Sequence, residues 1–151
     1  MIKIITVGSI KEKYLKDAID EYTKRISKYT NIEIIEVKDE GLVESKKAII
    51  LEEEKILKHI NDKDYIITLE IEGRQLDSLE FAAKLDRIQL ESSNITFIIG
   101  GSYGLSQNIK DKSRLHLSFS KMTFPHQLFR VLLLEQIYRA FKINNNESYH
   151  K

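Results

Sequence analysis

The stretch Ile95-Thr96-Phe97-Ile98-Ile99-Gly100-Gly101-Ser102-Tyr103-Gly104 passes from an apolar run into a loop with three glycines. A short apolar run bounded by turn residues is typical of a buried β-strand. Glycines allow tight turning and close backbone approach to a ligand, and exposed N–H groups there can hold an anion or an adenine edge. A loop that only turns the chain is the alternative. In an open α/β sheet, ligands bind beyond the carboxyl ends of the strands, where this loop would lie.

Strand and helix patterns alternate on both sides of this stretch. Short runs rich in β-branched residues predict further strands at Ile2–Val7, Ile32–Val37 and Tyr65–Ile71, and the alternating pattern of Leu115–Phe119 predicts another. Apolar residues at helical spacing predict helices over about 11–28, 41–60, 77–90 and 125–142. Asp77 and Glu80 have the spacing of a capping box. The alternation predicts an α/β fold with a mostly parallel sheet and helices on both faces. No linker or repeat interrupts it, so residues 1–151 are expected to form one domain.

Composition excludes several classes of protein. The chain is 42% hydrophobic and 31% charged, which argues against disorder. It has no cysteine, which excludes disulfides and thiolate metal sites and fits the reducing cytoplasm. No apolar run approaches the roughly 18 residues of a membrane span. Four scattered histidines have no metal-ligand spacing, so we expect no metal.

Charge is concentrated toward the end of the chain. Residues 121–151 hold five basic and two acidic residues, a net charge of +3, whereas the whole chain is only +1. A basic end on an otherwise balanced chain favours an anionic partner at that end.

The glycine loop is similar to a dinucleotide-binding motif but does not match it. The fingerprint G-x-G-x-x-G needs a glycine where Ile99 stands, and Phe124 occupies the place of the expected ribose-binding acid. This argues against an NAD site and leaves another nucleotide-like ligand open.

Two other segments follow predicted strands. Phe119-Ser120-Lys121-Met122-Thr123-Phe124 carries three large apolar side chains, which suits either an aromatic ligand or a loop packed beneath the last helix. Leu69 with Glu70–Gly73 has only the pattern of a strand end and a turn.

The last helix is apolar almost all round. Because a small domain offers little to cover both sides, we expect one side to meet a second copy in a two-fold homodimer. His126 and Arg130 share a face with no carboxylate between them, so a phosphate or a base is expected to partner Arg130. The closing Tyr149-His150-Lys151 is either a frayed end or a group that stacks on a base and holds its phosphate; we expect it to be mobile without RNA.

A larger set of motifs emerges when these segments are read together. It consists of Gly100–Gly104, Ser118–Gln127, Arg130, Glu135–Phe141 and Tyr149–Lys151, with Ile5–Gly8 and Lys11–Tyr14 near the start. The set resembles the RlmH family, small SPOUT-type methyltransferases of bacterial large-subunit ribosomal RNA. The resemblance covers the whole chain and is densest after Ile95.

The resemblance implies an S-adenosylmethionine-dependent enzyme that methylates N3 of a pseudouridine in the 23S rRNA of the assembled ribosome. It implies a homodimer and a deep trefoil knot within about residues 95–142, and only the resemblance supplies the knot, since true knots are nearly absent from proteins. The donor pocket it implies is formed by Leu69, Gly100, Phe119, Ser120, Lys121, Met122, Thr123 and Phe124.

Roles for the remaining polar residues follow as hypotheses. We assign Arg130, Tyr149 and His150 to binding of the substrate RNA, and His126 to support of the knotted loop. The general base is unknown, with His126 and His150 as candidates. One departure from the family is Asn144-Asn145-Asn146-Glu147, where a glycine-containing turn often precedes the closing motif. The alternatives are a methyltransferase of a tRNA base, a nucleotide-binding regulator without catalysis, and a dimeric structural module.

Overall fold

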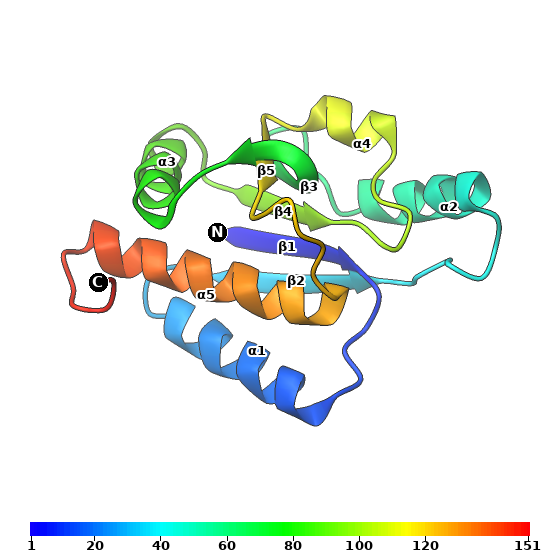
Figure 1. The fold of residues 1–151 in the computed structure, drawn as a ribbon. Helices are drawn as coiled ribbons and strands as arrows, with labels where there is room; N and C mark the ends of the chain where they lie inside the picture. Colours follow the sequence, from blue (N-terminus) through cyan, green and yellow to red (C-terminus); the bar gives the residue numbers. More distant parts are fainter.

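The computed structural model describes all of residues 1–151, as five strands and five helices that alternate almost throughout (Figure 1). The elements are β1 (Ile2–Val7), α1 (Lys13–Ile26), β2 (Ile32–Val37), α2 (Ser45–Leu57), β3 (Tyr65–Gln75), α3 (Ser78–Glu91), β4 (Ile95–Ile99), α4 (Gln107–Lys112), β5 (Leu115–Ser118) and α5 (His126–Asn144).

The strands form one sheet in the order β2-β1-β4-β3-β5, and every neighbouring pair is parallel. The predicted α/β class with a parallel sheet is therefore confirmed. All carboxyl ends lie at the same edge of such a sheet, so the loops after β1, β3, β4 and β5 come together there.

Side chains alternate between two cores because successive residues of a strand point to opposite faces. Ile2 and Ile4 belong to the larger core, with α1, α3 and α5, whereas Ile5 and Val7 belong to the smaller one, with α2 and α4. The helices after β1, β3 and β5 thus cover one face, and the helices after β2 and β4 cover the other. Where the connections that follow two neighbouring strands run to opposite faces of the sheet, a crevice opens at the sheet edge. The loop after β4 has such a crevice on either side.

Helix α5 is covered within a single chain. It lies between α1 and α3 over the sheet (Figure 1), and Leu128, at 41%, is its one exposed large apolar residue. The expectation that a second copy must bury one side of this helix is wrong as argued, because two neighbouring helices already cover it. A dimer therefore needs other support.

Three local features differ from the sequence-based expectation. Helix α4 was not expected; its six residues are too few for an apolar period, although Ser106 caps it by accepting a hydrogen bond from the Ile109 N–H. Pro125 precedes the first turn of α5 instead of lying in it. Strand β3 continues to Gln75, and its register on β5 is interrupted between Leu69 and Arg74. The capping box of Asp77 and Glu80 is confirmed.

Candidate active site

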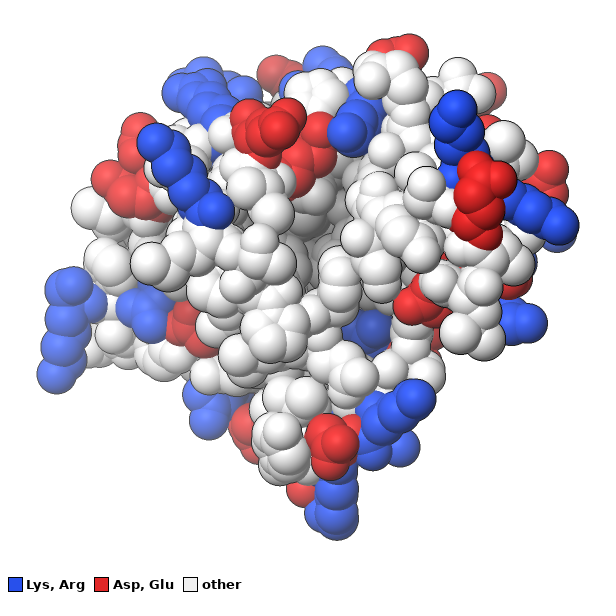
Figure 2. Space-filling model, turned by 45° about the vertical axis from the view of Figure 1, so that its right-hand side comes forward, with Lys and Arg blue, Asp and Glu red and all other residues white.

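A cleft of about 490 Å³ opens at the carboxyl ends of β3, β4 and β5. Its volume is within the range of roughly 300–1,000 Å³ typical of small-molecule sites. Figure 2 shows a hollow in a mostly uncharged face of the molecule, with acidic and basic side chains at its upper edge. Three segments far apart in the sequence form the walls: Leu69–Glu72 in the middle of β3, the glycine loop (Gly100–Gly104) and the loop that follows β5.

The structure brings together seven of the eight residues assigned to the donor pocket. They are Leu69, Gly100, Phe119, Ser120, Met122, Thr123 and Phe124; Lys121 alone does not line the cleft. The segment from Leu69 to Glu72 had only the pattern of a turn, yet it supplies one wall. Its sequence gives no signal for this, because the wall forms where β3 departs from the register of β5.

Each glycine of the glycine loop is needed for a different structural reason. Gly104 has a φ of +80°, a conformation that only glycine adopts at little cost. Gly100 has no room for a side chain, because a Cβ there would lie 2.9 Å from the carbonyl carbon of Gly104. A Cβ at Gly101 would lie 2.9 Å from Val7 Cγ1. The loop therefore combines one glycine in the left-handed region with two glycines whose backbone is packed too closely for a side chain.

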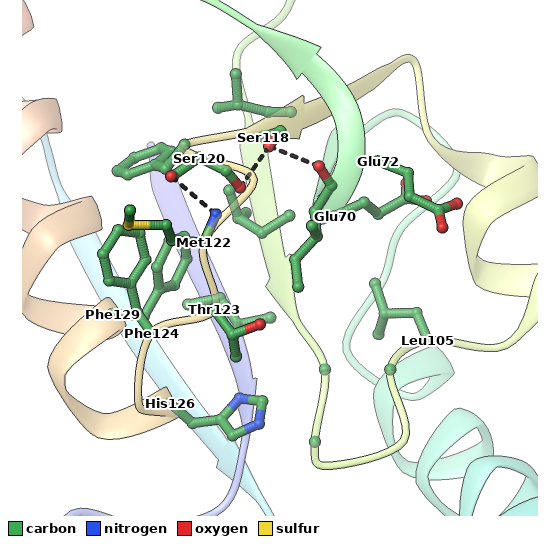
Figure 3. Close-up of a pocket in the computed structure, with 18 of the residues that line it drawn as sticks. Glu70, Glu72, Leu105, Ser118, Ser120, Met122, Thr123, Phe124, His126 and Phe129 are labelled. Carbon is green, nitrogen blue, oxygen red and sulfur yellow. Dashed lines mark hydrogen bonds between the residues drawn. The ribbon is translucent and has the colours of Figure 1, made fainter.

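The loop after β5 is fixed from both ends (Figure 3). The Ser118 hydroxyl is 2.8 Å from the Ile71 carbonyl oxygen and 3.1 Å from that of Ser120, and the Met122 N–H donates to Ser120 Oγ at 3.0 Å. Phe119 packs edge-on against Phe129 of α5, with ring centroids 5.0 Å apart. The loop thus packs on the last helix and lines the cleft at once.

An acidic group at the rim of the cleft is held by three polar partners. The Glu70 carboxylate accepts a hydrogen bond from the Thr68 hydroxyl at 2.6 Å and pairs with the His116 ring, while Lys110 Nζ lies 3.8 Å from its other oxygen. These contacts fix the charge that Glu70 presents to the cleft. Sequence reasoning left His116 without a role, because its partner is 46 residues away in the chain.

A second cleft, of about 910 Å³, opens beyond β1 and β2 on the other side of the glycine loop. Gly101 and His126 line both clefts, so the two meet there. Figure 3 places His126 at the end of the first cleft, away from Ser118. Of the two base candidates, His126 therefore lies at the site within a single chain.

Arg130 has a carboxylate partner, contrary to the argument from its neighbours on the helix. It is only 3% exposed, and its guanidinium donates to Glu36 at 2.5 Å, to Thr6 Oγ1 at 3.2 Å and to the Gly8 carbonyl at 3.3 Å. The absence of a carboxylate on the same face of α5 was a misleading signal, because Glu36 comes from β2, 94 residues away. Arg130 thus ties α5 to the ends of β1 and β2, beneath the second cleft.

The closing segment packs on the far end of α5. The Tyr149 hydroxyl donates to Glu135 at 3.1 Å, its ring lies 4.9 Å from that of Tyr138, and His150 Nδ1 is 3.1 Å from an Arg139 nitrogen. Burial, with the Glu135 charge second, raises the pKa of Tyr149 to about 12. The structure therefore docks the tail that we expected to be mobile, because an aromatic ring and a charged helix face are available to it.

Asn146 explains how the chain turns without the expected glycine. Its φ is +55°, and the Asn146 and Glu147 N–H groups donate to the carbonyls of Ile143 and Lys142, the pattern of a Schellman motif. Asparagine is among the few residues that adopt this conformation readily. The chain therefore makes a left-handed turn here without a glycine.

Tyr149 and His150 line neither cleft and contact Glu135 and Arg139 of α5. These helix positions lie about 14 and 20 Å from His126 along the axis, at roughly 1.5 Å per residue. Within one chain, the tail is therefore separated from the junction of the clefts at His126. No group of three or more histidine, cysteine, aspartate or glutamate side chains is placed to hold a metal ion. None of the helices is both long and apolar enough to cross a bilayer.

The family of the chain follows from comparison with known proteins. Residues 1–150 match the family model described as "Predicted SPOUT methyltransferase", and the chain belongs to this family of methyltransferases. A solved structure with a similar fold is that of a probable methylase family protein from Haemophilus influenzae Rd KW20. Its TM-score is 0.59 at 15% identity, over 99% of this chain and 70% of that one.

Within the family, the similarity points to one group, the ribosomal RNA large subunit methyltransferase H proteins. A Clostridium botulinum protein of that name is 52% identical over 99% of both chains. A Methanococcus maripaludis protein provisionally given the same name is 57% identical, again over 99% of both chains. The chain is a member of this group, which confirms the resemblance.

Proposed function

We propose that the protein transfers a methyl group from S-adenosylmethionine to N3 of a pseudouridine in 23S rRNA, with the assembled ribosome as substrate. The observation that carries the proposal is the cleft itself: three segments that the family resemblance assigned to the donor converge on it. The names of the relatives support ribosomal RNA as the acceptor. A ribosomal substrate also supports a cytoplasmic location for the proposed reaction.

The residues of the first cleft fit this donor. Leu69, Phe119 and Phe124 offer apolar surface to a flat aromatic ring, and the backbone of Gly100 and Gly101 lines the same cleft. Glu70 sets a negative charge at the rim, which suits a cationic ligand. When bound, the donor would supply an electrophilic methyl group, so the chemistry that remains for the protein is positioning and proton removal.

Positioning is the task of the two clefts. We assign the acceptor base to the junction at Gly101 and His126, since a base that enters from the second cleft reaches the first one there. Holding two reactants in line contributes roughly 7–11 kcal/mol in favourable cases. N3 of the base must lose its proton, and a general base contributes about 10²–10⁴-fold. His126 is our candidate for that role, because it lies at the junction.

We further propose a homodimer, in which the tail of one chain reaches the site of the other, and a trefoil knot within about residues 95–142. The separation of Tyr149 and His150 from the clefts supports the dimer, because an RNA-binding role for both needs a second chain. Arg130 would then act on the RNA through the shape of the second cleft, beneath which its guanidinium is buried.

The test is transfer of labelled methyl from S-adenosylmethionine to intact ribosomes that lack the modification. Free ribosomal RNA and bulk tRNA run alongside. We expect label on the intact ribosome only. Label on tRNA alone would contradict the acceptor assignment, and donor binding without transfer to any RNA would contradict the proposed reaction.

A further inference from the structure

A buried carboxyl group lies directly behind the glycine loop, outside both clefts. Glu52 of α2 is 2% exposed, and its side chain belongs to no ion pair. Its Oε2 accepts a hydrogen bond from the Glu40 N–H at 2.9 Å, whereas its Oε1 has no hydrogen-bond partner. A buried acidic residue is costly unless something offsets it, so its position needs a reason.

The carboxyl group of Glu52 packs against the bare Cα of Gly101. A Cβ at that position would lie 3.2 Å from Oε1 and 3.4 Å from Oε2. Glu52 therefore touches the glycine loop with one side of its carboxyl group and holds the Glu40 N–H with the other. Gly101 is the residue that lines both clefts, so this contact is made at their junction.

The segment Asp39–Gly41, which follows β2, is tied to the glycine loop a second time. The Tyr103 hydroxyl donates to the Gly41 carbonyl at 3.2 Å. Lys55 of α2 pairs with the Glu40 side chain and holds the segment from the helix side. Two loops that flank the second cleft are thus joined through α2.

The environment of Glu52 favours its neutral form. Burial raises the pKa of Glu52, and the nearby Asp39 and Glu40 charges act in the same direction, against the Glu40 N–H hydrogen bond. The oxygen of a glutamine amide can accept the Glu40 N–H hydrogen bond as Oε2 does, and the amide carries no charge. Glutamine is therefore a close replacement for Glu52.

We propose that Glu52 is a positioning residue, which holds the glycine loop in its donor-binding shape by tying it to the segment Asp39–Gly41. This rests on the proposed function in that the ligand is S-adenosylmethionine. Glu52 acts through Gly101 and touches neither the donor nor the acceptor.

The test compares two replacements of nearly equal volume. Glu52→Gln keeps an oxygen that can accept from the Glu40 N–H, and Glu52→Met removes it without leaving a cavity. Glu54→Gln is the matched control, since Glu54 is exposed on the same helix. Dissociation constants for S-adenosylmethionine are measured by calorimetry, and KM and kcat on ribosomes are measured at varied donor concentration.

We expect Glu52→Met to raise the donor Kd and KM about tenfold, the order that follows from losing a hydrogen bond to a buried group. Its kcat at saturating donor should stay within about twofold of wild type, because the reacting groups are untouched. Glu52→Gln and the control should bind the donor as wild type does. Equal donor affinity in all variants, or a Glu52→Gln protein as weak as Glu52→Met, overturns the proposal.

A second measurement needs no variant. Hydrogen exchange of the wild-type protein is followed with and without the donor. Because Glu52 joins the two loops, the donor should slow exchange at the Glu40 and Gly41 amides as well as in the glycine loop. Protection confined to the glycine loop overturns the inference while leaving the proposed function intact. A wild-type protein that binds no donor overturns the proposed function first.

Discussion

Replacing Gly101 by alanine tests the packing behind the cleft most directly. The backbone φ of Gly101 is not in the left-handed region, which in this chain is occupied by Gly8, Gly104 and Asn146. An alanine at position 101 is therefore resisted by sterics alone. Its Cβ would come within 2.9 Å of Val7 Cγ1, a distance that real Cβ atoms essentially never show, so one of the two atoms must move.

The expected cost follows from that contact. Overfilling a packed interior destabilises by about 1–3 kcal/mol, and Val7 is a stiff β-branched residue that is 4% exposed. Val7→Ala alone removes two buried carbons and should cost about 1.6 kcal/mol at roughly 0.8 kcal/mol each. The double variant loses the clash, so we expect it to be about 1–2 kcal/mol more stable than the sum of the single effects.

The assay is urea unfolding of the wild type, both single variants and the double variant, as a double-mutant cycle. Gly104→Ala is the control. Its φ of +80° opposes any side chain, although nothing lies within 4 Å of a Cβ there. Its cost of about 1–2 kcal/mol should therefore simply add to that of Val7→Ala. If Gly101→Ala and Val7→Ala add to within about 0.5 kcal/mol, the steric argument is refuted.

Three further predictions concern groups outside the first cleft. In urea unfolding, Glu36→Gln should destabilise the protein by about 1–2 kcal/mol more than Arg130→Met does, because Glu36→Gln leaves a buried guanidinium without its counter-charge. The reverse order would contradict the burial of Arg130. Asn146→Ala should cost about 1 kcal/mol in thermal unfolding and Asn146→Gly close to nothing, since the φ of +55° penalises alanine; equal losses would argue against the left-handed turn. The pKa of Tyr149 is raised to about 12, whereas its pKa in the unfolded chain is about 10. The stabilisation that the neutral Tyr149 provides is therefore complete below a pH of about 10 and is lost as the pH rises to about 12. Ultraviolet titration against Tyr149→Phe should show this late ionisation, and an ordinary titration would contradict the docked tail.

Much of the fold could be predicted because its signals are local. The β-branched runs at Ile2–Val7 and Ile32–Val37 match β1 and β2 residue for residue, and the capping box of Asp77 marks the start of α3. These patterns work because strand burial and helix capping depend on neighbours within a few residues. Helix α4 could not be predicted, because its six residues span fewer than two turns and are too few to form an apolar stripe.

The candidate site was predictable in part for a related reason. Gly100 and the run Phe119–Phe124 follow recognisable strands, and parallel strands bring their carboxyl ends to one edge. Glu70 and Glu52 carried no such signal. Their environments depend on His116 and Gly101, which lie 46 and 49 positions further along the chain and become neighbours only when the sheet and helices assemble.

The sequence by itself determined the alternation of elements, the parallel sheet and the loops at its carboxyl edge, because hydrophobic spacing and glycine positions express local preferences. Only the tertiary structure decided which charges are paired and which surfaces are free. The spacing on α5 predicts an anionic ligand for Arg130, whereas β2 places Glu36 beside it. The apolar surface of α5 predicts a partner chain, whereas α1 and α3 cover it. Whether a charge is paired or a helix face is covered depends on residues distant in the chain, which local spacing does not specify.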